Sequence, residues 1–188
     1  MPRLRRAVVL AACAVLVGAL AGLAIADPFH LRHIRWFTAG LVLLAVLLLT
    51  AAFAVAVRGV LRVFVLVVGG VAALGWVAVV ALADQVGVEN REVSEVAEGD
   101  RRLVVVEGAL GAIDPVYAVV LRSGGGPFEQ ETVVYQGVEA APAPAEVRFV
   151  DPDTVEVRTG AGCAYRSEVE AVTLAVDPVH RPLRAYGC

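Results

Sequence analysis

The feature that most constrains this chain is an uninterrupted apolar run from Val63 to Ala83, which ends at Asp84. An α-helix rises about 1.5 Å per residue, so about 20 apolar residues cross a hydrocarbon layer of about 30 Å. No charged residue interrupts the run. The sequence therefore predicts a transmembrane helix over 63–83 and a division of the chain at its end.

Two similar runs precede this one, at residues 7–26 and 36–57. With 59% hydrophobic residues, the 188-residue chain is too apolar for an ordinary soluble domain. We expect residues 1–83 to form a three-helix transmembrane anchor in a lipid bilayer.

The first run has two other interpretations. Cleavage after Ala26 would make it a signal peptide, but the run is longer than the usual core of about 7 to 15 residues. Residues 10–13, which end at Cys13, resemble a lipoprotein box, yet the apolar stretch before Cys13 is too short for processing. We expect a retained helix, with cleavage after Ala26 as the alternative.

Small residues recur at every fourth position of this helix, at Ala14, Gly18, Gly22 and Ala26. Such a stripe lets two helix backbones approach closely within a membrane. We expect it to pack against the other two helices; homodimerisation or a partner helix is the alternative.

The three runs contain no Asp, Glu, His, Lys or Arg. Proton relays, ion pathways and voltage sensors need ionisable groups inside the membrane. A stand-alone transporter is therefore not expected, and only a non-catalytic transporter subunit fits.

The loop between the first two runs carries Asp27, His30 and His33. Two His residues three apart can share a metal ion, but with one carboxylate on an Arg-containing interfacial turn they more often contact lipid headgroups. We predict no metal site and no cofactor.

Charge is distributed unequally along the chain. Residues 1–83 have seven Arg and one Asp, whereas residues 84–188 have nine Arg and eighteen acidic residues. The Arg residues near the amino end and at 58 and 62 favour a cytoplasmic amino terminus and an extracytoplasmic carboxyl domain. A net charge of −9 on that domain argues against nucleic acid and favours protein partners or cations.

Residues 84–100 read as a polar juxtamembrane stalk, either a short helix capped by Asn90 or a linker. Beyond it, β-branched residues alternate with polar ones between turn signals. We expect a small antiparallel all-β domain over 101–188, sandwich or barrel-like, with strands at 102–107, 115–122, 131–137, 146–150, 154–159, 163–169 and 171–176.

One register follows from the sequence. Pairing residues whose numbers sum to 304 sets Phe149 against Val155 on one face and Arg148 against Glu156 on the other. Pro152 in the turn fits this register only if a bulge is present. Two turn aspartates, at 151 and 153, lack the spacing of a calcium loop and are read as turn formers.

Cys163 and Cys188 are the only cysteines outside the predicted helices. In an oxidising compartment we expect them to form a disulfide, which by the chain-entropy estimate contributes about 3.5 kcal/mol. The pair would fix the carboxyl-terminal tail to the sheet.

No catalytic set emerges from the outer domain. Its three serines lie outside any GxSxG motif, and its single histidine, His180, is accompanied only by the turn residue Asp177. We therefore expect a protein-interaction module of the cell envelope, either an accessory subunit of a complex or an immunity-type protector. The alternative is an envelope enzyme, which would gather His180 with a serine or carboxylates in a pocket.

Overall fold

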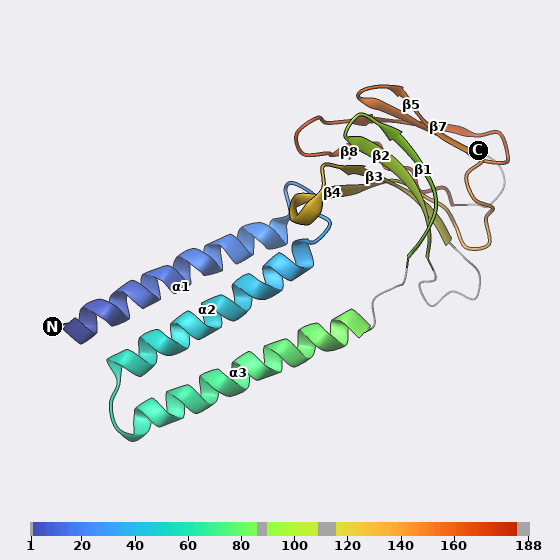
Figure 1. Cartoon of the computed structure of the whole chain (residues 1–188). Coiled ribbons are helices and arrows are strands. Elements are labelled where there is room, and N and C mark those ends of the chain that lie inside the picture. Colours follow the sequence, from blue (N-terminus) through green and yellow to red (C-terminus); the bar gives the residue numbers. More distant parts are fainter. Residues whose placement is uncertain (1, 86–89, 109–115, 184–188) are drawn as a thin grey trace. The chain divides into compact units, whose positions relative to one another are not determined.

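The computed structural model describes residues 2–85, 90–108 and 116–183 (Figure 1). Three helices come first: α1 (Pro2–Ala26), α2 (Ile34–Ala56) and α3 (Val60–Gln85). Each is long and apolar enough to cross a membrane. The prediction of three long apolar helices is confirmed, with ends that differ from those of the apolar runs by up to five residues.

Small residues bring the helices together. On α1 the buried positions are alanines seven residues apart, Ala7, Ala14 and Ala21. α2 and α3 approach closely at Gly69, where a methyl group would overlap Thr50, and the Trp76 indole N–H donates to the Ala39 carbonyl at 3.0 Å. Without the hydrophobic effect to drive association in lipid, this close backbone approach is what packs such helices.

The rest of the chain forms two four-stranded antiparallel sheets. In chain order the first contains β1 (Arg91–Glu98), β2 (Arg101–Gly108), β3 (Val116–Ser123) and β4 (Gln130–Gln136), with a short helix η1 (Gly126–Phe128) between the last two. The second contains β5 (Glu146–Asp151), β6 (Thr154–Arg158), β7 (Ala164–Val169) and β8 (Val176–Asp177). The predicted fold class, three apolar helices followed by a small all-β domain, is confirmed.

A hydrophobic core joins the two sheets. Leu103, Leu121 and Val134 of the first sheet cluster with Val155 and Val157 of the second, each at most 1% exposed. Alternate residues of the first sheet, Val104, Val106 and Val120, form a separate buried cluster on its other face. The two sheets therefore make a sandwich whose inner faces are fixed by strand alternation.

The β5–β6 register is as predicted. Phe149 pairs with Val155 and Arg148 with Glu156, and the register shifts between Phe149 and Asp151, where the bulge was expected. Asp151 accepts a hydrogen bond from the backbone N–H of Asp153, which is the role of a turn former.

Two elements differ from the sequence expectations. Residues 91–98, expected as a helix or linker, form β1 and pair with β2. All eight residues of β1 are exposed. Its sequence therefore does not alternate between apolar and polar residues, which is the pattern that identifies a half-buried strand. Residues 171–176 are mostly a turn, and only Val176 and Asp177 pair, with β7.

The connection between α1 and α2 belongs to the β domain. Residues 29–33 group with the sheets rather than with the helices. Leu31 forms a β-bridge with Gln130, the N–H of Arg32 donates to the Glu129 carbonyl at 2.9 Å, and the N–H of Glu131 donates to the His30 carbonyl at 2.8 Å. A segment of the membrane hairpin thus adds a short strand to the edge of β4.

Candidate interaction surface

β1 is an open sheet edge. It is the outermost strand of the first sheet, all eight of its residues are exposed, and no described residue pairs with its outer side. Val93 and Val96 are 49% and 37% exposed. An edge of this kind offers unpaired backbone N–H and C=O groups to another chain.

The opposite edge of that sheet is covered. Besides the 29–33 segment, the tail crosses β4: the His180 N–H donates to the Val134 carbonyl at 3.0 Å, and the Gln136 N–H donates to the His180 carbonyl at 2.9 Å. Of the two edge strands of the first sheet, β1 is therefore the one whose outer side stays open to another chain among the described residues.

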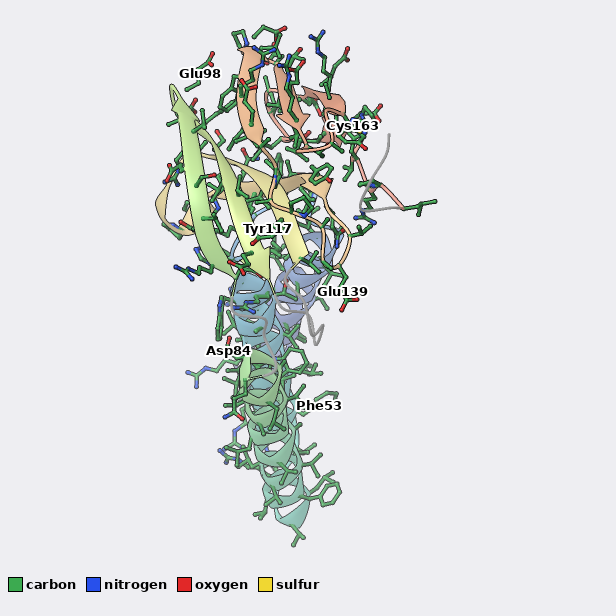
Figure 2. All side chains as sticks on the ribbon, turned by 90° about the vertical axis from the view of Figure 1, so that its right-hand side faces the viewer. Phe53, Asp84, Glu98, Tyr117, Glu139 and Cys163 are labelled. Carbon is green, nitrogen blue, oxygen red and sulfur yellow. The ribbon has the colours of Figure 1, made fainter. Side chains whose placement is uncertain are left out.

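An acidic pocket of about 320 Å³ lies at the tip of β1, between the β1–β2 and β5–β6 turns. Glu98, Asp100 and Asp153 line it, with Phe149 and Pro152 as apolar wall. Arg101 also lines it and donates to the Pro152 carbonyl and to Asp153, which ties the two turns together. Figure 2 shows Glu98 at the end of β1, where the chain turns into β2. The pocket has the charge and size to receive a basic side chain.

The other acidic residues of β1 are not free for a partner. Glu92 accepts a hydrogen bond from Arg122 at 2.5 Å, and Glu95 lies 3.8 Å from Arg102. The hydrogen bond and charge of Arg122 lower the pKa of Glu92 below its ordinary value. These contacts fix β1 to the sheet and leave Glu98 as the strand's carboxylate with no ion pair to a described residue.

Glu129 and Arg122 are the buried members of the same charge network, at 4% and 6% exposure. Burial raises the pKa of Glu129, but the hydrogen bond from Arg32 at 2.6 Å and the charges of Arg102 and Arg122 lower it below its ordinary value. Arg122 also donates to Glu131 at 2.6 Å. Since burial of an unpaired charge is costly, the ion pairs of Glu129 and Arg122 stabilise the folded domain.

A second network lies on the outer face of the other sheet. The Glu156 side chain is 1% exposed and accepts hydrogen bonds from Arg166 at 2.6 Å, Arg148 at 2.7 Å and Arg158 at 2.8 Å. These bonds, with that from Arg166 the largest cause, lower the pKa of Glu156 to about 2. The β5–β6 register had already identified Arg148. Arg166 was missed because the sequence pattern indicates no register between β6 and β7.

Only one cysteine of the predicted disulfide can be placed, because Cys188 lies outside the described residues. Cys163 is 4% exposed and immediately precedes β7, on the sheet to which the tail was expected to be fixed (Figure 2). The disulfide stays a prediction.

The four residues of the small-residue stripe on α1 differ in burial. Ala14 is buried in the helix packing, but Gly18 and Gly22 have open space around them, and Ala26 is exposed. The buried face of α1 repeats every seven residues and includes Ala14 alone of the stripe, and a packing role for the other three residues stays a prediction.

Two of the histidines and one of the serines considered for catalysis or metal binding make hydrogen bonds to backbone carbonyls. The His180 imidazole donates to the Arg166 carbonyl at 2.9 Å and packs on Tyr165, and the Ser167 hydroxyl donates to the Pro178 carbonyl at 2.8 Å. His30 donates to the Thr173 carbonyl at 3.0 Å. The described part of the chain contains no group of three or more His, Cys, Asp or Glu able to hold a metal ion.

No protein-family model, curated protein or solved structure matches this chain.

Proposed function

We propose that this chain is a membrane-anchored, extracytoplasmic protein-interaction module, acting as an accessory subunit of an envelope complex or as an immunity-type protector. The observation that carries the proposal is the open edge of β1 with the acidic pocket at its tip. The partner we infer is an extended protein segment with a basic side chain.

Binding by strand addition fits this edge. A partner strand would gain main-chain hydrogen bonds along β1, while Val93 and Val96 would supply apolar contact. The pocket at Glu98, Asp100 and Asp153 would select a Lys or Arg at one end of the partner segment. The net charge of −9 over residues 84–188 would steer a basic partner towards the domain.

Location supports the same proposal. Three crossings of the membrane would put the 27–33 loop and the carboxyl domain on one side of it, and residues 29–33 group with the sheets of the β domain. The Arg residues at the opposite helix ends favour the cytoplasm for the other side. The domain would then stand in an oxidising compartment, where the Cys163–Cys188 pair would form.

Site-specific photo-crosslinking in native membranes tests the proposal. A photoreactive amino acid at Val93 or Val96 should give adducts with one protein partner, and high salt should weaken them. The matched control is Val172, which is 67% exposed on a turn of the other sheet and should give none. Absence of adducts from β1, or equal adducts from Val172, would contradict the proposal.

A charge-reversed variant tests how much the acidic pocket contributes to partner binding, apart from the edge of β1. Glu98→Arg removes a pocket carboxylate without breaking any ion pair among the described residues, so the domain should remain folded. We expect crosslinking from Val96 to fall about tenfold, the equivalent of one lost charged hydrogen bond at a binding interface. Glu168→Arg, an exposed change on β7, should leave crosslinking unchanged.

A further inference from the structure

Four arginines converge at the end of the helical unit where α1 begins and α2 passes into α3. Arg3 and Arg6 of α1, Arg58 after α2 and Arg62 of α3 line one pocket of about 250 Å³. They come from three separate segments, so this cluster is made by the packing of the helices and not by a single basic stretch of sequence.

Among the described residues of the helices, no acidic side chain lies near these positive charges. None of the four side chains forms an ion pair or hydrogen bond with any residue that the structure describes. The acidic residues of the first 85 positions are Asp27 and Asp84, at the far ends of α1 and α3. A helix of 25 residues is about 37 Å long, which is several Debye lengths at physiological salt.

The pocket also has an apolar wall and a helix amino terminus. Ala54 and Val57 of the α2 end line it beside the arginines, and α3 begins next to it at Val60. The free N–H groups of a first helical turn favour an anion, and arginine presents a planar fork that fits phosphate oxygens. The apolar wall is the end of a membrane-spanning helix, so the pocket lies at the level of the lipid headgroups. Its ligand must therefore be a molecule that is present at that level.

We propose that this four-arginine pocket binds the phosphate headgroup of an anionic phospholipid. Basic pockets between transmembrane helices suit such headgroups. A charge of +4 is better matched by a lipid with two phosphates than by one with a single phosphate. The lipid would hold α1 to the α2–α3 connection, at the opposite end of the helices from the α1–α2 loop.

The test uses the full chain purified in neutral detergent. Native mass spectrometry would measure retention of cardiolipin, which has two phosphates, of singly charged phosphatidylglycerol, and of zwitterionic phosphatidylcholine. We expect cardiolipin to be retained most strongly, phosphatidylglycerol less strongly and phosphatidylcholine least. The Arg58→Gln, Arg62→Gln double variant should weaken cardiolipin retention by about fivefold for each arginine removed, given the usual contribution of one Arg at an anionic surface.

Arg5→Gln is the matched control, because Arg5 is an exposed arginine of the same helix end that does not line the pocket. It should retain cardiolipin like the wild type, and all variants should share the wild-type unfolding temperature in neutral detergent. Equal losses in Arg5→Gln and in the double variant would show a diffuse surface charge and overturn the proposal. Displacement of the lipid by millimolar inorganic phosphate would also overturn it, since the site would then bind a free ion.

Discussion

At the scale of single residues, the β domain depends on carboxylates buried among arginines. Glu156 is almost fully covered, yet it is ionised because three guanidinium groups donate hydrogen bonds to it. The strand pairing imposes this arrangement: β5 sets Arg148 beside Glu156 from one side, and β7 sets Arg166 beside it from the other. One acidic residue therefore links three neighbouring strands.

This network predicts a pH dependence of stability. The pKa of Glu156 is about 2 in the folded protein against 4.5 when unperturbed, so its contribution is complete above about pH 4.5 and is lost as the pH falls through 2. Glu156→Gln should lower the unfolding temperature at about pH 6. Between about pH 6 and pH 2.5, the unfolding temperature of the variant should fall by less than that of the wild type. Thermal unfolding of the full chain in detergent measures both.

The control for that variant is Glu168→Gln, on β7 of the same sheet, which removes an exposed carboxylate with no ion pair to a described residue. It should unfold like the wild type at both pH values. A Glu156→Gln protein with the wild-type pH profile would show that the ion pairs of Glu156 contribute nothing to stability.

At the scale of elements, the two edges of the first sheet differ: β4 is covered by the loop between α1 and α2, whereas β1 is open. Arg32 in that loop contributes both its backbone N–H and its side chain, which bonds the buried Glu129. The loop is therefore held by charge as well as by strand pairing.

Arg32→Gln should loosen this attachment. Glu129 would keep Arg102 but lose Arg32, at a local cost of about 1–2 kcal/mol. Hydrogen exchange at the Glu131 amide, which donates to the loop, should then be about tenfold faster, as measured by mass spectrometry. Arg35→Gln removes the same charge from α2, where Arg35 pairs with Asp84, and should leave that exchange rate unchanged.

Elements whose partners lie nearby in the chain could be predicted from the sequence. The β5–β6 register followed because apolar pairing and charge pairing agreed across a turn of a few residues. β1 was missed because a fully exposed strand has no apolar alternation, and its partner contacts, such as Glu92 with Arg122, are set by the sheet. The 29–33 strand was missed for a related reason: Arg32 reaches Glu129 across 97 positions, and no local pattern encodes that contact.

At the scale of the whole molecule, function depends on which side of the membrane the β domain occupies. We propose that each of the three helices crosses the membrane, which would put the α1–α2 loop and both sheets on the same side; the uneven distribution of arginines favours the outside for that side. An exterior domain with an open, acid-tipped strand is suited to receive a protein partner, whereas a cytoplasmic one would face neither envelope partners nor oxidising conditions.

The most direct test is the accessibility of an epitope tag inserted into the exposed β3–β4 hairpin at Gly125, compared with the same tag after Gly59 between α2 and α3. On intact cells, the account predicts that antibody and external protease reach the Gly125 tag, and that the Gly59 tag becomes accessible only after permeabilisation. Accessibility of the Gly59 tag on intact cells, with the Gly125 tag protected, would contradict an extracytoplasmic interaction domain.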